Sequence, residues 1–295
     1  MSILKYKEKY ESDLYKLYCK AHKIHFDEEK KNTEDKTFYS FNNFEIYLLS
    51  INKRLKGYVI FSKSYSFFGN NVIDIDDIFI EKDYCNYSNY CMLIESINKG
   101  FFRKKYKYCK LVSRGKRDKK LVALFDLKPI KIMYEMQINL NNFKEIYMDD
   151  PKIITFKRGI DELKRAEVQN SIFSDSDEHV DCSVNDILYE EKQDFFIDDG
   201  CFFLNIDGIT AGYSQIIIEK SSNPKPYIVN FGIVKKYRKQ GHAKELLNHT
   251  LGIIKRKGFN NAYVMVNAGN IKAYNLYKGF GFHKVSTLCC YLFKY

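Results

Sequence analysis

The chain contains a weak internal repeat, in which features of its first half recur about 154 residues later. Gly57-Tyr58 lies in an apolar run and recurs as Gly212-Tyr213, 155 positions further along. The stretch 73–80 recurs as 227–234 at a spacing of 154, and a helical pattern follows each copy. A sequence that repeats its plan once at this period predicts two modules of the same kind.

Each copy predicts the same order of elements: a strand, one or two helices, three strands, a helix, a strand, a short helix and closing strands. The closing strands are expected at 131–140 and 285–294, and turn-forming residues occupy 141–150. The 295 residues are enough for two cores. We therefore predict two α/β domains, 1–145 and 150–295, each with a mixed, mostly antiparallel sheet flanked by helices.

A basic, glycine-containing turn lies in the second half between the apolar strand 227–234 and an amphipathic helix. Free amides at a helix N-terminus bind anions, and Gly241 lets a phosphate approach the backbone without a Cβ in the way. Several side chains of the turn add positive charge. The turn therefore predicts a phosphate site formed by Arg238, Lys239, Gln240, Gly241, His242, Ala243 and Lys244.

The corresponding stretch of the first half lacks these features. At a spacing of 154, Tyr84 faces Arg238 and Tyr87 faces Gly241. A bulky ring thus occupies the place where a phosphate requires bare backbone. We expect the first domain to serve as structure or as a wall for the substrate, and the second to hold the phosphate.

The motifs that follow the basic turn occur in a fixed order: a strand at 261–266, then Asn270, Ala273 and Tyr277, then Gly281-Phe282. Over residues 226–283 this order resembles the GNAT superfamily of acyl-CoA-dependent N-acyltransferases, with its R/Q-x-x-G-x-G/A, N-x-x-A-x-x-x-Y and G-F motifs. The resemblance implies a GNAT fold in each half, with two central strands that splay apart around acetyl-CoA. The pantetheine arm is then expected along Ile233 and Val234, with the pyrophosphate on the amides of 239–244.

The same resemblance implies roles for two residues of the short helix near 270–277. Tyr277 is expected to give a proton to the departing CoA thiolate, and Asn270 either caps the helix or binds the pantetheine arm. Many GNAT relatives carry a glutamate on the strand equivalent to 226–234, where this chain has no carboxylate. The candidates for the general base are Glu219, Asp198, Asp199 and Tyr227 acting through water, and an amine of low pKa needs no base.

We expect an enzyme that transfers acetyl from acetyl-CoA, its co-substrate, to a primary amine of a small molecule. The acidic run 175–178 with Asp181 either attracts a cationic amine or forms a solvated loop. The missing carboxylate supports an alternative, a non-catalytic protein that binds or senses acyl-CoA. A tRNA-dependent aminoacyltransferase of the tandem type is a third possibility, disfavoured because such enzymes do not need the CoA turn.

Composition restricts the partners. The net charge of +11 accompanies abundant lysine, asparagine, isoleucine and tyrosine throughout the chain. We interpret the basic runs 103–107 and 114–120 as a solvated helix end and loop, and we expect no nucleic-acid partner.

The cysteine pattern and the apolar runs bear on metal sites and location. The eight cysteines form no C-x-x-C pair, and Cys19, His22 and His25 lack a second cluster that would complete a metal site, so we expect no metal. The N-terminus has no apolar segment of signal-peptide length, and no run of about 18 apolar residues occurs. The sequence therefore predicts a soluble, cytoplasmic protein without a membrane partner.

Overall fold

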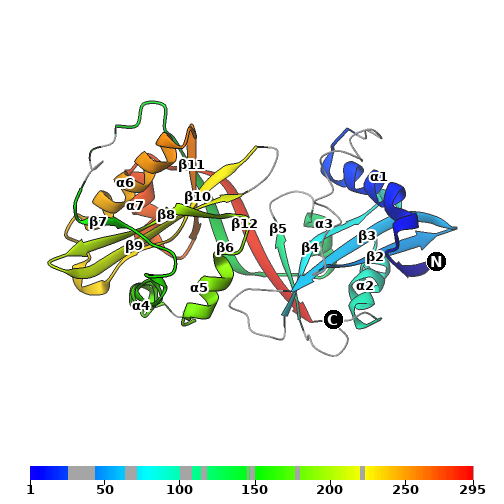
Figure 1. Cartoon of the computed structure of the whole chain (residues 1–295). Helices are drawn as coiled ribbons and strands as arrows, with labels where there is room; N and C mark the ends of the chain where they lie inside the picture. The colour runs from blue at the N-terminus through cyan, green and yellow to red at the C-terminus, as the bar shows by residue number, and fades with distance from the viewer. Residues whose placement is uncertain are drawn as a thin grey trace. The chain divides into compact units, whose positions relative to one another are not determined.

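The chain forms two compact units, which are described separately (Figure 1). The first comprises Met1–Ile132 and Leu288–Tyr295, and the second comprises Met133–Thr287. The computed structural model describes residues 1–25, 44–63, 72–99, 108–113, 118–144, 146, 150–176, 180–219 and 223–294. The basic runs 103–107 and 114–117, and residues 177–178 of the acidic run, lie outside these ranges.

The first unit is a sheet with helices on both faces. Its strands are ordered β1-β2-β3-β4-β5-β12, and only β4 and β5 pair in parallel. Leu14 and Leu17 of α1 pack on one face, and Leu93 and Ile94 of α2 pack on the other. The elements are β1 (Ser2–Lys5), α1 (Glu11–His22), β2 (Phe44–Ile51), β3 (Arg54–Lys63), β4 (Val72–Ile80), α2 (Tyr87–Glu95), β5 (Tyr108–Ser113), α3 (Lys119–Leu124) and the end of β12 (His283–Lys294).

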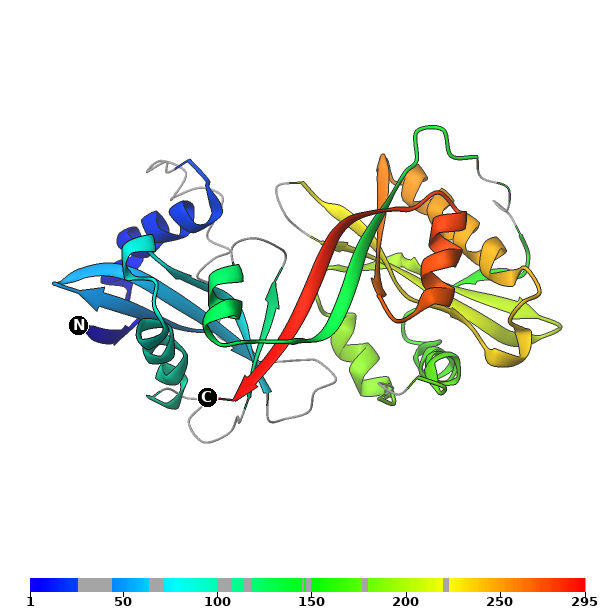
Figure 2. The ribbon, with the colours of Figure 1, turned by 180° about the vertical axis from the view of Figure 1, so that it is seen from behind.

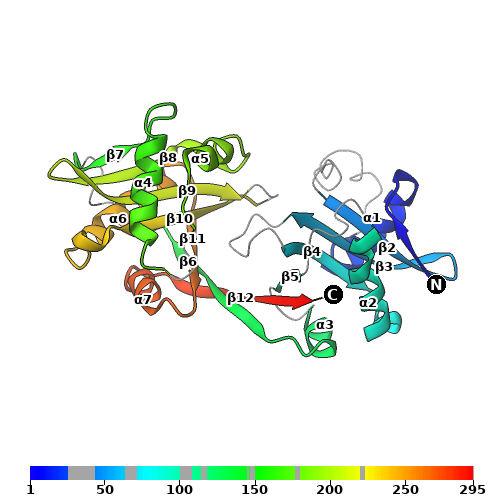
Figure 3. The same ribbon diagram turned by 90° about the horizontal axis from the view of Figure 1, so that it is seen from below.

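The second unit repeats this plan. Its strands are ordered β6-β11-β10-β9-β8-β7, with β10 and β11 parallel. Figure 3 shows α4 on one face of β8–β10, and α6 packs on the opposite face. The elements are β6 (Pro129–Asn139), β7 (Ile153–Thr155), α4 (Glu162–Phe173), α5 (Val184–Glu190), β8 (Phe196–Ile206), β9 (Ile209–Glu219), β10 (Lys225–Ile233), α6 (His242–Arg256), β11 (Asn261–Asn267) and α7 (Ile271–Gly279).

Alternation along the strands explains how the second unit buries both faces of its sheet. In β8, Phe202 and Leu204 point toward the apolar face of α6, whereas Phe203 packs with residues of α4. Helix α6 presents Leu247 and Leu251, which are fully buried and four residues apart, on one face. The predicted fold class and the predicted order of elements are confirmed in both halves.

The closing strands have exchanged units, which the sequence did not predict. Strand β6 follows the first unit along the chain, yet it pairs with β11 of the second from Asn139–Asn261 to Met133–Asn267. Strand β12 ends the chain and pairs with β5 from Cys289–Ser113 to Lys294–Tyr108 (Figure 2). A single cut between 145 and 150 therefore separates the two halves of the sequence but not the two compact units.

Two further findings concern the cysteines and the length of the helices. All eight cysteines are free thiols. Within the described ranges, no helix is both long and apolar enough to cross a membrane.

Candidate functional site

The central strands of the second unit form a fork. Strands β10 and β11 pair at only two positions, Tyr227–Tyr263 and Ile228–Val264. Beyond them β10 continues beside β9 as far as Ile233, whereas β11 stays beside β6. A bulge between Val229 and Gly232, with Asn230 at φ 49°, accompanies the separation. The fork is the splayed pair that the resemblance implied, and it leaves the facing backbone edges of both strands free to bind a chain with amide groups.

The turn after β10 presents a row of free backbone amides. Lys239 and Gly241 adopt positive φ angles of 65° and 92°, and α6 begins at His242. The N–H groups of residues 239–243 donate to no group in the part of the chain that the structure describes, while those of Lys244 and Glu245 donate to the Gly241 carbonyl. These amides lie at the N-terminus of a 15-residue helix, whose dipole favours an anion.

Space above the turn is open as well. A Cβ built on Gly241 would meet no protein atom within 4 Å. The backbone angle is therefore what requires glycine here, because no protein neighbour crowds the position. Free amides, a left-handed glycine and open space together suit an anionic group such as a phosphate.

The side chain of Arg238 makes protein contacts. Its Nε donates to the carbonyl of Ile233 at 2.8 Å, and its Nη2 donates to the carbonyl of Ile172 at 2.7 Å. Its Nη1 lies 2.6 Å from Oδ2 of Asp175, and this hydrogen bond holds the pKa of Asp175 below its usual value. Arg238 thus fastens the turn to the end of α4, and Asp175 of the acidic run is engaged with it.

Other side chains of the turn differ in their availability. Nδ1 of His242 hydrogen-bonds to Glu245 at 3.1 Å, and Nε2 of Gln240 donates to the carbonyl of Lys236 at 3.3 Å. Lys239 and Lys244 are exposed. These two lysines are therefore the side chains of the turn that extend into solvent beside the free amides.

Tyr277 lies on α7 and reaches the fork through an aromatic contact. Its ring is 6.1 Å from that of Phe231, in the bulge of β10, and 5.5 Å from that of Phe282. The residue is only 7% exposed, and burial raises the pKa of its hydroxyl well above the ordinary value. The phenol is therefore protonated at neutral pH, as a proton donor must be.

Asn270 begins the same helix. Its Oδ1 accepts from the backbone N–H of Ala273 at 3.1 Å, so the residue is the N-cap of α7. Capping is thus the one of its two expected roles that the contacts display.

A polar network covers the α4 side of the fork. Nη2 of the fully buried Arg165 lies 2.8 Å from both carboxylate oxygens of Glu190 and 3.1 Å from Oε1 of Gln215. The same Gln215 oxygen accepts from Nδ2 of Asn230 at 2.9 Å. The network joins α4, α5 and β9 to the bulge of β10. Sequence reasoning missed it, although the position of Arg165 on the same helix face as Val168 and Ile172 was a usable signal.

The candidate bases occupy different places. Glu219 ends β9 and pairs with Lys225, at the opposite end of β10 from Ile233. Asp198 lies 2.8 Å from Nη2 of Arg158, and Asp199 lies 2.6 Å from Nζ of Lys257. The partners of these three carboxylates, Lys225, Arg158 and Lys257, all lie outside the stretch of β10 from Val229 to Ile233 that separates from β11.

Tyr227 is the candidate base that lies at the fork. Its hydroxyl donates to Oε1 of Glu135 on β6. Sequence reasoning missed Glu135 because it assigned residues 131–140 to the first domain.

The turn after β4 of the first unit has the opposite character. Helix α2 begins at Tyr87, and its N-cap Asn86 accepts from the N–H of Asn89 at 2.9 Å. The amides of Tyr84, Cys85 and Asn86 all donate to backbone carbonyls. Asn86 is therefore the N-cap that corresponds to Gly241. A constant spacing of 154 instead aligned Gly241 with Tyr87, which is the next residue.

The structure also shows the contacts of two members of the group Cys19, His22 and His25 in the first half. Cys19 is buried, and Nε2 of His22 lies 2.8 Å from Oδ2 of Asp77. Across the described ranges, no three His, Cys, Asp or Glu side chains are grouped to hold a metal.

Known proteins resemble this chain in sequence. Residues 165–282 match the acetyltransferase (GNAT) family. A mycothiol acetyltransferase from Stackebrandtia nassauensis is 26% identical over 140 residues, which are 46% of this chain and 45% of that protein. The chain therefore spans less than half the length of this curated relative.

Solved structures resemble it over almost its whole length. A GCN5-related N-acetyltransferase from Sphaerobacter thermophilus has a TM-score of 0.66 at 12% identity, covering 99% of this chain and 95% of that one. A tandem GNAT protein from the clavulanic acid biosynthesis pathway also has a TM-score of 0.66, at 8% identity, with 99% and 98% covered. At these identities the likeness concerns the fold. The chain thus carries a domain of the GNAT acetyltransferase family in residues 165–282, within the overall fold of a tandem GNAT protein.

Proposed function

We propose that the second unit transfers an acetyl group from acetyl-CoA to a primary amine of a small molecule. The observation that carries this proposal is the row of free amides at 239–243, which lies at the open end of a strand fork. The GNAT match over residues 165–282 supports the same conclusion. The named activity of the mycothiol relative is consistent with acetyl transfer, and the acceptor of this chain is left to experiment.

The residues that would hold acetyl-CoA follow from the contacts. The amides of 239–243 would bind its phosphates, with Lys239 and Lys244 adding charge, and the edge of β10 that faces the fork, which leads to Ile233 and Val234, would bind its amide-containing arm. Arg238 would act by keeping the turn in shape, given its bonds to the main chain and to Asp175. Bound acetyl-CoA supplies an activated thioester carbonyl to the amine.

Tyr277 would protonate the sulfur that leaves. While the attacking nitrogen still carries a positive charge, the amine competes with the thiolate as a leaving group, and a proton on sulfur favours departure of CoA as a thiol; the buried phenol carries such a proton at neutral pH. Glu219 remains a proposed base from the sequence, and it lies beside Lys225, at the end of β10 away from Ile233 and the phosphate turn.

Thiol release tests the proposal directly. Acetyl-CoA is incubated with glucosamine, putrescine and tyramine in turn, and free CoA is measured by a thiol reagent while calorimetry measures binding. An acetyltransferase releases thiol in an amine-dependent manner. A sensing protein, favoured by the absence of a carboxylate on 226–234, would bind acetyl-CoA without turnover. Salt-dependent binding of tRNA would instead support an aminoacyltransferase.

A further inference from the structure

A buried carboxylate from β6 lies beside the fork of the second unit. Glu135 is 6% exposed and Tyr227 is 8% exposed, and the Tyr227 hydroxyl donates to Oε1 of Glu135. Lys225 approaches the same oxygen at 3.9 Å and lies over the ring of Tyr263. A carboxylate removed from water to this extent needs partners of this kind, and its main partner here is a phenol, which can pass on a proton.

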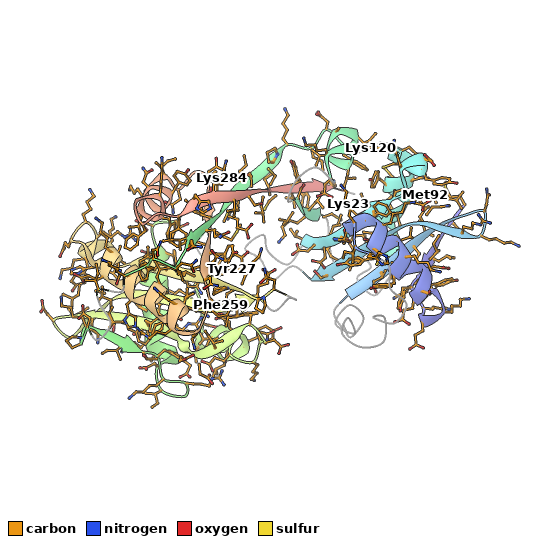
Figure 4. The ribbon with its side chains drawn as sticks, turned by 90° about the horizontal axis from the view of Figure 1, so that it is seen from above. Lys23, Met92, Lys120, Tyr227, Phe259 and Lys284 are labelled. Carbon is orange, nitrogen blue, oxygen red and sulfur yellow. The ribbon has the colours of Figure 1, made fainter. Side chains whose placement is uncertain are left out.

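The pair lies at the closed end of the fork. Tyr227, labelled in Figure 4, pairs with Tyr263 one position before the last contact between β10 and β11, and the two rings are 5.4 Å apart. A chain that enters at the turn 239–243 and lies between the strands reaches its deepest point there. A proton-transfer group at this point would therefore lie beside the end of the bound ligand chain.

The pair lies on the face of the second unit's sheet that is turned away from α6. Ile228 and Met136 alternate with Tyr227 and Glu135 along their strands, and both belong to the apolar cluster beneath α6. Tyr227 and Glu135 therefore lie on the opposite face. That face also carries Gln215 and the Arg165 network, so a polar acceptor meets hydrogen-bonding groups on both sides of the fork.

The other carboxylates of this face are less suited to accept a proton. Both carboxylate oxygens of Glu190 lie 2.8 Å from Nη2 of the buried Arg165, so this carboxylate is already engaged by a guanidinium. Glu219 ends β9 and stands opposite Lys225 in the strand register, so it lies farther from the open end of the fork than Tyr227 does. The titratable and charged groups that face Glu135 in the described ranges are Lys225 and Tyr227 on β10 and Tyr263 on β11.

We infer that Tyr227 and Glu135 form a proton relay that deprotonates the acceptor amine, an inference that rests on the proposed function. One N–H proton of the ammonium group passes to Oη of Tyr227 while the phenolic proton passes to the Glu135 carboxylate. Tyr227 is then neutral again, Glu135 is protonated, and the amine is neutral.

The remaining steps balance with the residues already described. The amine nitrogen forms a bond to the carbonyl carbon, and the bond from that carbon to sulfur breaks with its electron pair on sulfur. Tyr277 gives its proton to the thiolate and regains one from the nitrogen, which sheds its second proton as the amide forms. The proton on Glu135 returns to solvent. Tyr227 is the catalytic residue of the relay, and Glu135 is a positioning residue and proton store that acts through it.

The test compares Tyr227→Phe and Glu135→Gln with the wild type, using the amine of the panel that is acetylated fastest. We expect kcat/KM at pH 7 to fall about 100-fold in each variant, the scale of one general base, and acetyl-CoA affinity to stay unchanged. The loss should shrink as the pH rises toward the pKa of the free amine, because the acceptor then arrives neutral. The double variant should be no slower than the single ones, since the two residues act as one unit. Glu167→Gln, an exposed carboxylate on α4, is the matched control and should behave as wild type.

Distinct results would overturn the relay. A loss of the same size at every pH indicates a structural role, and wild-type rates in Tyr227→Phe exclude the relay outright. A pH-dependent loss in Glu219→Gln without one in Glu135→Gln assigns the base to Glu219. If Glu135→Gln does not fold, Tyr227→Phe decides, because it keeps the ring and the carboxylate. Absence of thiol release in the wild type is a failure of the proposed function itself, and is seen before any variant is compared.

Discussion

Each unit has a turn that leads from a central strand to the next helix, from β4 to α2 in the first unit and from β10 to α6 in the second. The two turns differ in length by two residues. Residues 238–241 separate the short 3-10 helix Lys235–Tyr237 from α6, whereas only 85–86 separate Lys82–Tyr84 from α2. The shorter turn satisfies its amides internally and caps its helix with Asn86. The longer turn leaves the amides of 239–243 free. An insertion of two residues thus separates a helix start that serves the fold from one that can serve a ligand.

The largest expected effect comes from closing the longer turn. Gly241→Tyr places a ring beside the free amides and imposes a side chain on a backbone at φ 92°, so we expect acetyl-CoA affinity to fall at least about 100-fold by calorimetry. Gly258→Tyr is the matched control. Gly258 has φ 88° and equally open space, but it lies beyond the other end of α6. Equal loss of affinity in both variants would show that backbone strain, and not the amide row, is responsible.

The next largest effect compares substitutions in two equivalent short helices, α7 of the second unit and α3 of the first. Tyr277→Phe keeps the packing against Phe231 and Phe282 but removes the proton donor. We expect turnover to fall about 100-fold while acetyl-CoA affinity stays within twofold. Helix α3, Lys119–Leu124, has no tyrosine, so Val122→Tyr in that helix should leave turnover unchanged. Unaltered turnover in Tyr277→Phe would remove this residue from the mechanism.

Removing the N-cap of a helix in each unit should have a smaller effect, of about the same size in both units. Asn86→Ala and Asn270→Ala each remove a side-chain acceptor for a backbone N–H, of Asn89 and Ala273 respectively. Each should lower the free energy of unfolding by about 1 kcal/mol in denaturant titrations. Acetyl-CoA affinity should be unchanged in Asn86→Ala. A drop in affinity in Asn270→Ala that exceeds its stability loss would show that Asn270 also binds the pantetheine arm.

The smallest effect concerns the ion pair that fastens the longer turn. Asp175→Asn should destabilise the protein by less than about 1 kcal/mol at pH 7, because both partners are partly exposed. The pKa of Asp175 is lowered by its bond to Arg238, so the pair stabilises the fold above the ordinary pKa of an aspartic acid. That stabilisation is lost as the pH falls through the lowered value. The difference between wild type and variant, followed by thermal unfolding, should therefore shrink in acid; a constant difference would contradict this origin.

Patterns local in sequence predicted most of the fold. Periodicity gave the order of strands and helices, and the turn at 238–244 was recognised from its glycine and its basic residues. The partner of a closing strand was not predictable in this way, because alternation along β6 or β12 shows which residues share a face and not which strand lies alongside. The pairing of Glu135 with Tyr227 depends on that choice, and it was missed for the same reason.

Side-chain contacts over long sequence distances were the other limit. Arg238 was expected to face a phosphate, since the motif gives its charge and place in the turn. Its bonds to Ile172 and Asp175 depend on where α4 ends in space. The free amides could be foreseen from the turn itself, because they arise from the local path of the backbone.

The exchange of closing strands has a consequence for how the protein is made. Synthesis from the N-terminus delivers β5 long before β12, so the first sheet keeps an unpaired edge at β5 until residues 289–294 have been translated. Strand β6, in contrast, is available before its partner β11 exists. We therefore expect a polypeptide stopped shortly before residue 288 to contain β6 already paired with β11, and a first sheet whose β5 edge is open to wrong pairing.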